Sequence, residues 1–502
     1  MSVLPGSIAV VLVTLATLLI GTWGLRLSRT TSDFFVASRT VRPGLNASAI
    51  GGEYLSAASF LGVAGLLLTF GADMLWYPVG WTAGYLVLLV LVAAPLRRSG
   101  AYTLPDFAEA RLASRRARNL CSLLVVAVAW LYLLPQFEGA GITLAAAVGV
   151  PRWVGPVVVG LVVLVNVGSG GMRSITFVQA FQYWLKLTAL LIPAAILLVV
   201  WAGDNVSGPS ATSDSWSMPL SSGTQGLYAT YSLVIATFLG TMGLPHVVVR
   251  FYTNPDGRAA RRTTLVVLGL LGVFYVIPPV YAALGRAYGA GSTGRADTLV
   301  LDLPRLILPG LGGEVLTGLV TAGAFAAFLS TSSGLTIAVS GVLTQDVTGR
   351  WLPEVTAFRV ATAIAVLIPL AAALVLPDVG VARVVGLAFA VAASTFCPLL
   401  VLGIWWRGLT DVGAVAGLLV GGAGSVTAVV WTLTHSPTVS RGGSAGSEWV
   451  DVLLAQPAAW SVPLAFATMV LGSRLTPQRV PSGARRFMVR LHTPETVELD
   501  RS

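Results

Sequence analysis

"IGGEYLSAASFLGVAG", residues 50–65, places an acid, serines and glycines inside a stretch apolar enough to cross a membrane. In lipid, an interrupted helix is tolerated only where it faces protein or a cavity. Gly51 and Gly52 each weaken a helix by about 1 kcal/mol relative to alanine. We therefore expect a broken, buried span whose released carbonyls can point at a cation. The alternative is that these small residues let neighbouring helices approach closely.

The composition of the whole chain places it in a membrane. Of its 502 residues, 55% are apolar and only 10% are charged, whereas soluble domains carry roughly 25% charged residues. The formal charge of +10 comes from basic residues between apolar runs, which indicates topology signals and anionic headgroups rather than a nucleic-acid partner. Cys121 and Cys397 lie in apolar stretches and provide no disulfide framework.

The apolar runs predict an all-α polytopic protein with about thirteen transmembrane helices, since ~20 helical residues cross the hydrocarbon. The expected spans are 6–26, 46–70, 74–96, 119–149, 152–169, 177–202, 225–245, 263–286, 311–345, 357–377, 380–406, 411–434 and 450–472. We expect residues 1–475 to form one transmembrane domain. Residues 476–502 should form a basic cytoplasmic tail that is partly disordered.

The distribution of basic residues predicts the orientation. If the N-terminus is outside, 24 of the 31 lysines and arginines fall on the inner side and six on the outer side. This bias predicts a plasma (cell inner) membrane protein with an external N-terminus and a cytoplasmic C-terminus.

Helix breakers recur at corresponding places in two halves of the chain. Span 46–70 carries the glycines described above, and span 225–245 carries Gly240, Gly243 and Pro245. Each is the first of five spans, and because five is odd the two halves have opposite orientations. Such paired breakers in inverted halves indicate a transport site. The core repeats are 46–202 and 225–406, and the peripheral helices are 6–26, 411–434 and 450–472.

A second polar span, "AFAAFLSTSSGLTIAVSG" at 324–341, contains Ser330 and Thr331. Carbonyls from one broken helix and hydroxyls from another would make a weak, reversible cage for a small hard cation. The alternative is that the hydroxyls bond back to carbonyls one turn earlier in their own helix.

Ionisable groups inside spans are functional candidates, because they are costly in lipid. Glu53 and Glu138 are candidates for coupling. Lys186 could pair with a carboxylate anion, but we favour snorkelling to the inner interface. For substrate binding, the candidates are Tyr132, Gln136, Thr241 and Gly243. A hydrogen bond to a neighbouring helix is the alternative for Gln136, and the broken segment around Thr241 and Gly243 could direct N–H groups at a carboxylate.

Five segments of the chain resemble the sodium:solute symporter family, most closely its acetate permease and monocarboxylate branch. They are "SDFFVASRTVRPGLNASAIGGEYLSAASFLG" (32–62), "YTLPDFAEARL" (102–112), "GGMRSITFVQAFQYWLKL" (170–187), "TMGLPHVVVRFYTNPDGRAARR" (241–262) and "STSSGLTIAVSGVLTQD" (330–346). The resemblance implies thirteen helices, an inverted five-plus-five core in spans two to eleven, and alternating access driven by an inward ion gradient.

The resemblance also implies a sodium site. Its ligands would be the backbone oxygens of Gly52, Leu55 and Ala327 and the hydroxyls of Ser330 and Thr331. One departure concerns an acid that proline-transporting relatives carry at the position matching Tyr54. Here the acid is one residue earlier, at Glu53.

We therefore expect secondary active import of a small monocarboxylate, such as acetate, propionate or pyruvate, coupled to sodium. The alternatives are another small organic solute, such as proline or pantothenate, and proton coupling through Glu53 or Glu138. The partners are the solute, sodium and the bilayer, with no cofactor. We expect no enzymatic activity, since histidine occurs only at positions 246, 435 and 492 and no HExxH, nucleophile-elbow or phosphate-loop motif appears.

Overall fold

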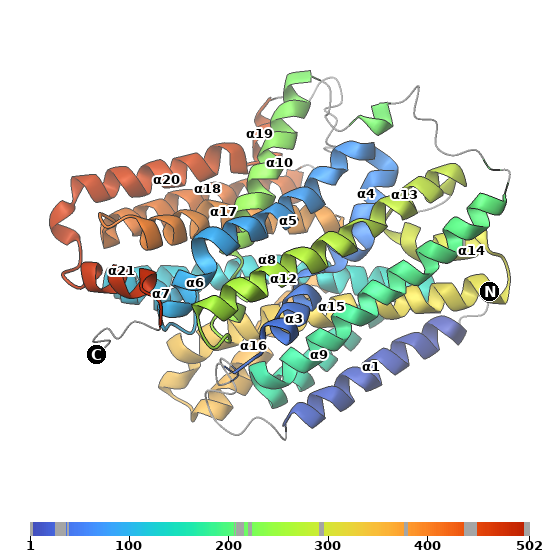
Figure 1. Ribbon diagram of the computed structural model, residues 1–502, viewed down its shortest axis with the longest axis horizontal. Coiled ribbons are helices and arrows are strands. Elements are labelled where there is room, and N and C mark those ends of the chain that lie inside the picture. The colour runs from blue at the N-terminus through green and yellow to red at the C-terminus, as the bar shows by residue number, and fades with distance from the viewer. Residues whose placement is uncertain are drawn as a thin grey trace.

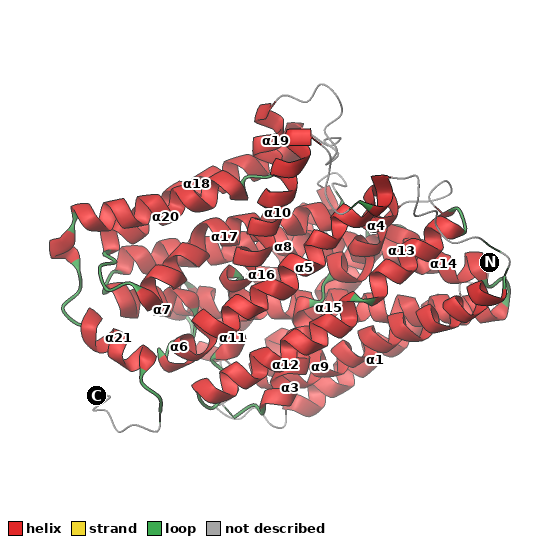
Figure 2. Ribbon diagram, turned by 45° about the horizontal axis from the view of Figure 1, so that its top comes forward, coloured by secondary structure: helices red, strands yellow, loops and turns green. Residues whose placement is uncertain are grey.

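The computed structural model describes residues 4–25, 37, 40–204, 206, 215–218, 223–290, 296–375, 380–435 and 449–495. Within these ranges the chain consists of helices joined by turns and loops, with no strand (Figure 2). It is an all-helical, multi-pass membrane protein.

The helices of the first half are α1 (Leu4–Leu25), α3 (Pro43–Tyr54), α4 (Val63–Phe70), α5 (Trp76–Val87), α6 (Ala93–Arg98), α7 (Leu104–Leu112), α8 (Arg115–Val148), α9 (Val154–Gly203), α10 (Gly223–Gly243) and α11 (Pro245–Phe251). Those of the second half are α12 (Gly257–Tyr275), α13 (Ile277–Ala287), α14 (Leu299–Ile307), α15 (Leu311–Asp346), α16 (Glu354–Val375), α17 (Val381–Trp405), α18 (Asp411–His435), α19 (Trp449–Ala455), α20 (Ala458–Leu475) and α21 (Ala484–His492). Two π-helical segments, Ala58–Gly62 and Leu88–Val92, join α3 to α4 and α5 to α6.

Eleven helical stretches in the described part of the chain are long and apolar enough to cross a membrane. Two of them, Ala58–Arg98 and Val154–Gly203, contain 41 and 50 residues, enough for two crossings each. The first turns at Gly71 (φ 79°) and the second at Gly171 (φ 59°), in the left-handed region that favours glycine. Each of the thirteen expected spans therefore lies mostly on helix, and residues 26, 376 and 377 at the ends of two spans lie outside the described residues.

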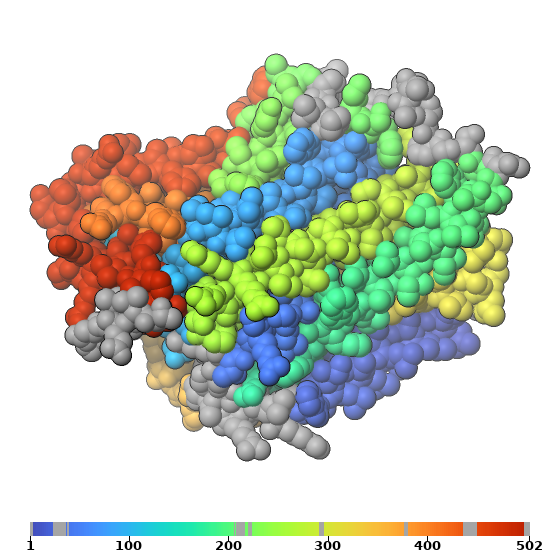
Figure 3. All heavy atoms as spheres, in the orientation of Figure 1, coloured from blue at the N-terminus to red at the C-terminus, as the bar shows by residue number. Residues whose placement is uncertain are grey.

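The long helices run side by side along the longest axis of the molecule (Figure 1). Helices α6, α7 and α21 lie at one end, and α4, α13 and α14 lie at the other. Helices α15 and α17 are innermost. In each of them, 89% of an 18-residue apolar stretch is buried, against 28% in α1. On the face shown in Figure 3, α1, α9 and α12 lie next to one another, and their outward side chains, such as Leu19, Val199 and Val273, are more than half exposed, as lipid-facing residues should be.

Both predicted helix breaks are present, at positions that the dihedral angles define. Helix α3 ends at Tyr54, and Leu55 (φ −73°, ψ 85°) leaves the helical region before the chain resumes helix at Ala57. Helices α10 and α11 are separated by Leu244 (φ −71°, ψ 118°), and Pro245 begins α11, where its missing N–H costs nothing.

Gly51 and Gly52 do not form the break, because both remain helical in α3. They provide close packing instead. A Cβ atom on Gly52 would lie 2.1 Å from the Gln179 carbonyl oxygen of α9, and one on Gly51 would lie 2.8 Å from the Tyr183 ring. Their role in the fold is thus the close approach of α3 and α9, the alternative considered above.

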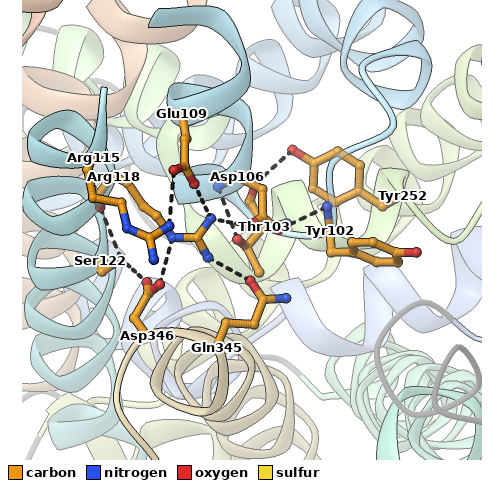
Figure 4. A network of polar contacts seen from close by, with 10 residues as sticks. All are labelled: Tyr102, Thr103, Asp106, Glu109, Arg115, Arg118, Ser122, Tyr252, Gln345 and Asp346. Carbon is orange, nitrogen blue, oxygen red and sulfur yellow. Dashed lines mark hydrogen bonds and ion pairs between the residues drawn. The ribbon is translucent and has the colours of Figure 1, made fainter. Parts of the chain in front are cut away.

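Arg118 joins three helices at the end of the bundle that the arginine distribution predicts to be cytoplasmic (Figure 4). From the first turn of α8, its guanidinium contacts Asp106 at 2.8 Å and Glu109 at 2.6 Å in α7. It also contacts Asp346 at 2.6 Å and Gln345 at 3.0 Å at the end of α15. This network fixes α7, α8 and α15 to one another.

Part of the predicted tail is helical and packs against the bundle. Within residues 476–495, α21 is a helix that buries Met488 and Leu491. Arg98 of α6 contacts Glu495 at 3.3 Å and the Leu491 carbonyl at 3.4 Å. Residues 484–492 of the predicted tail are therefore helical, because the apolar face of α21 packs against the bundle, and residues 496–502 lie outside the described residues.

Gly52→Ala tests the close contact between α3 and α9. Because the added methyl would meet a backbone oxygen, which cannot rotate away, we expect a loss of about 1–3 kcal/mol of stability. The measurement is thermal unfolding of the purified protein in detergent. Gly44→Ala is the matched control in the same helix, since nothing lies within 4 Å of its Cβ position. Equal melting temperatures for the two variants would contradict the packing role of Gly52.

Candidate cation and substrate site

Lys186, the only lysine in the chain, lies at the centre of the predicted cation site. Its side chain is fully buried, and its ammonium donates to the Gly52 carbonyl, to the Leu55 carbonyl at 2.7 Å and to Ser330 Oγ at 2.7 Å. An ammonium has three N–H donors and no acceptor, so these three oxygens satisfy it completely. The expectation that Lys186 snorkels to the interface is wrong, because its stem runs from α9 into the break of α3.

The five predicted sodium ligands lie in one connected network. Three of them bind the Lys186 ammonium, as just described. The Ala327 carbonyl accepts a hydrogen bond from Ser330 Oγ at 3.0 Å, and Thr331 Oγ1 donates to the Glu53 carbonyl at 2.6 Å. Both hydroxyls of α15 therefore face the break of α3, and the cationic group between the two helices is the Lys186 ammonium.

Glu53 and Arg250 form a buried ion pair beside this network. Arg250 Nε lies 2.7 Å from Glu53 Oε2, and the two side chains are 1% and 2% exposed. Arg250 also donates to Thr176 Oγ1 at 2.9 Å and to Gln179 Oε1. Gln179 Nε2 in turn donates to the Ser330 carbonyl at 2.8 Å. The pair thus connects α3, α9, α11 and α15 around the cation site.

Arg250 was not predicted as a site residue, because the arginine distribution places it with the residues that set the orientation in the membrane. Its local signal was available, because the residues on either side of it, Val247–Val249 and Phe251, are apolar. Glu53, the partner of Arg250, lies close to the backbone of α15. A Cβ atom on Gly334 would lie 2.0 Å from Glu53 Oε1. Glycine at 334 thus leaves room for the Glu53 carboxylate against α15.

The predicted substrate residues of α8 contact the break of α3. Gln136 Oε1 accepts from the Ala57 N–H at 3.0 Å, at the point where the helix resumes. Tyr132 Oη donates to Ser56 Oγ at 3.3 Å. Gln136 therefore pairs with an N–H group that the break releases. This contact is a hydrogen bond to a neighbouring helix, which was the alternative to substrate binding for Gln136.

The predicted residues of α10 lie on the other side of Tyr54. Thr241 Oγ1 and Tyr54 Oη are 2.9 Å apart and share a hydrogen bond. Gly243 packs closely, since a Cβ atom there would lie 2.4 Å from the Ala392 carbonyl of α17. Glu138 is half-buried and lies two residues after Gln136 on α8. It is therefore about 200° around the helix from Gln136, on another face of α8.

Six buried rings surround these groups, and we call them the aromatic centre: Tyr54, Trp81, Tyr85, Tyr132, His246 and Phe389. The rings of Tyr54 and Tyr85 are 4.9 Å apart, those of Tyr132 and His246 are 5.3 Å apart, and Phe389 lies 5.7–6.2 Å from three of the others. Of these rings, only Tyr132 is among the substrate candidates predicted from the sequence, since the rings come together through long-range contacts.

Several polar atoms of the aromatic centre are buried without a hydrogen-bond partner among the described residues. They are Trp81 Nε1, Tyr85 Oη and both ring nitrogens of His246. Buried polar groups are nearly always paired, so this concentration of unpaired groups indicates a place for a polar ligand. The donors face no acceptor of the described chain, which favours a ligand that accepts hydrogen bonds.

Comparison with protein families and curated proteins gives a consistent result. Residues 34–421 match the model of the sodium:solute symporter family. A Bacillus subtilis protein named "Uncharacterized symporter YwcA" is 30% identical, over 92% of this chain and 92% of its own length. A Corynebacterium glutamicum protein named "Monocarboxylic acid transporter" is also 30% identical, over 94% of this chain and 92% of its own length.

Solved structures share the architecture at low sequence identity. A Na⁺-coupled sialic acid symporter in a substrate-bound, outward-open state aligns over 94% of this chain and 97% of its own, with a TM-score of 0.70 and 16% identity. MhsT in complex with L-phenylalanine aligns over 86% of this chain and 98% of its own, with a TM-score of 0.56 and 16% identity. These likenesses support the inverted-repeat core that the paired breaks predict.

A double-mutant cycle on Glu53 and Arg250 tests the buried ion pair. Arg250→Met leaves an uncompensated buried carboxylate, so we expect a loss of about 3–5 kcal/mol of stability. Adding Glu53→Gln removes that charge and should restore part of the loss, which thermal unfolding would measure. The control is Arg479→Met at the exposed Arg479–Asp411 pair, where we expect no measurable change. Strictly additive effects of the two core variants would show that the groups are not coupled.

Proposed function

The chain belongs to the sodium:solute symporter family, and from this premise we propose that it imports a small monocarboxylate, such as acetate, propionate or pyruvate, by alternating access. Membership makes it a solute transporter rather than an enzyme. The observation that carries the substrate class is the set of unpaired buried donors in the aromatic centre, Trp81 Nε1 and Tyr85 Oη. The relative named monocarboxylic acid transporter, similar over most of both chains, supports the same class.

The chemistry of the aromatic centre suits a small carboxylate. A carboxylate only accepts hydrogen bonds, with about four lone-pair positions on its two oxygens. Trp81 Nε1 and Tyr85 Oη supply donors, and the ring faces of Phe389 and Tyr54 offer an apolar surface to a short alkyl or acyl group. Because the rings lie within about 6 Å of one another, a short-chain solute fits this environment better than a bulky one.

Proline, one of the alternative solutes, fits less well. Proline carries an ammonium-type nitrogen and would need an acceptor as well as donors. Within the described residues, the acid nearest the break of α3 is Glu53, and its carboxylate is engaged by Arg250. The charge arrangement therefore favours an anion without an amino group over an amino acid.

Alternating access requires movement at the two breaks. Tyr54, Trp81, Tyr85 and Phe389 are all buried, so a solute reaches them only when neighbouring elements separate. Leu55 and Leu244 have non-helical backbones and are the places where the halves of the broken helices can pivot. In the orientation predicted from arginine bias, the Arg118 network lies at the cytoplasmic end, and the solute moves toward it. A gradient drives this movement only through differential affinity for the two states.

Uptake into proteoliposomes tests the substrate class. We expect labelled acetate, propionate or pyruvate to accumulate under an imposed cation gradient, and unlabelled members of the same class to compete. Unlabelled proline and pantothenate should compete poorly. Accumulation of proline or pantothenate, with no uptake of any monocarboxylate, would overturn the proposal.

Tyr85→Phe tests the donor that we assign to the solute. A hydrogen bond to a charged group contributes ~1.5–3 kcal/mol, so the KM for the preferred monocarboxylate should rise about tenfold or more. Tyr281→Phe is the matched control, because its hydroxyl donates at 3.0 Å to the Leu190 carbonyl, away from the aromatic centre. If both variants keep the wild-type KM, Tyr85 does not bind the solute.

A further inference from the structure

We propose that the Lys186 ammonium is the resident cation of this transporter and takes the place of the sodium ion that the family resemblance implies between the break of α3 and α15. The inference rests on the proposed function only where transport is measured, since cation binding can be measured without a solute. It concerns the predicted ligands Gly52, Leu55 and Ser330, which in this chain hold a side chain of the protein itself.

The geometry of the cage leaves no position for a sodium ion beside Lys186. The ammonium occupies the point from which the Gly52 carbonyl, the Leu55 carbonyl and Ser330 Oγ are all within bonding distance. A sodium ion bound to the same oxygens would have to sit against the ammonium, where two like charges repel strongly in a buried site. The family's ion and this side chain therefore exclude each other.

The charges of the buried cluster lead to the same conclusion. Glu53 and Arg250 form a close pair and offset each other, which leaves Lys186 as one net positive charge. A bound sodium ion would bring that same charge to a cage of neutral oxygens. If sodium were added while Lys186 stayed in place, a second uncompensated charge would be buried, at a high desolvation cost.

The choice of residue also favours this role. Lys186 is the one lysine of the chain, and all its other strongly basic residues are arginines. A planar guanidinium suits paired oxygens, whereas an ammonium is a compact point charge with three donors. At Lys186 the three acceptors come from the broken end of α3 and from α15. None of them is a carboxylate, which is what we expect around a group that substitutes for an alkali-metal ion.

Sodium binding to the purified wild-type protein gives a direct test. Because Lys186 is the only lysine, protein labelled with ¹⁵N-lysine gives a single side-chain nitrogen signal. We expect this signal and the melting temperature to be the same in saturating sodium chloride as in potassium chloride. A saturable, sodium-specific change in the lysine signal would mean that sodium displaces the ammonium, and would overturn the proposal.

Lys186→Ala and Lys186→Met form a matched pair of variants. Lys186→Ala leaves the three oxygens without a cation but leaves space, so we expect sodium, and not potassium, to raise its melting temperature. Lys186→Met fills the same space with an apolar chain and should show no such response. If Lys186→Ala folds but its melting temperature does not respond to sodium, the proposal that the ammonium takes the place of a sodium ion is contradicted. If neither variant folds, the wild-type measurements decide the question.

Exchange of labelled for unlabelled pyruvate across proteoliposomes separates this inference from the proposed function. We expect wild-type exchange at the same rate in sodium, potassium and choline salts, and Lys186→Ala exchange to be faster in sodium. Wild-type exchange that requires sodium, together with a sodium-specific change in the lysine signal, overturns the inference. An absence of wild-type exchange in every salt counts against the monocarboxylate proposal alone, and the binding measurements then decide the inference.

Discussion

The centre of this protein depends on the hydrogen bonds from the Lys186 side chain to the broken end of α3. The break releases the carbonyls of Gly52 and Leu55 from regular helical bonding, and a lipid environment offers them no solvent. Lys186 satisfies both, and it extends the contact to Ser330 on α15. Three helices of the core, α3, α9 and α15, thus meet at one nitrogen atom, and the contacts of that nitrogen pair the carbonyls that the break releases.

The surrounding residues make this arrangement possible. Gly52 lets α3 lie against α9, which brings the Lys186 stem within reach of the break. Gln136 receives the Ala57 N–H released on the far side of the break. Arg250 pairs with Glu53, and these two groups and Lys186 are the charged side chains that we place at the centre within the described residues. The solute site that we propose lies next to these groups, because Tyr54 ends α3 and contacts Thr241 across the second broken helix.

Much of this could be predicted from the sequence, because the signals were local. Long apolar runs gave the spans, proline and glycine marked the second break, and serines in an apolar helix marked the face of α15 that turns toward α3. The features that could not be predicted depend on how closely helices distant in the sequence approach one another. The direction of Lys186 depends on the close approach of α9 to α3, and the burial of Arg250 depends on four helices meeting. Trp81 and Tyr85 join the site that we propose only when α5 packs beside α10 and the Trp81 ring meets Phe389 of α17. The glycines at 51 and 52 marked the correct span, but for a packing reason.

The most direct test of this account is an experimental density map of the protein prepared in sodium, at a resolution that separates the side chains around Gly52, Leu55 and Ser330. We predict continuous density from the α9 backbone through the Lys186 side chain to the point between these three oxygens, with no separate peak there. An isolated peak bound by the three oxygens, with the Lys186 side chain turned away, would contradict the account.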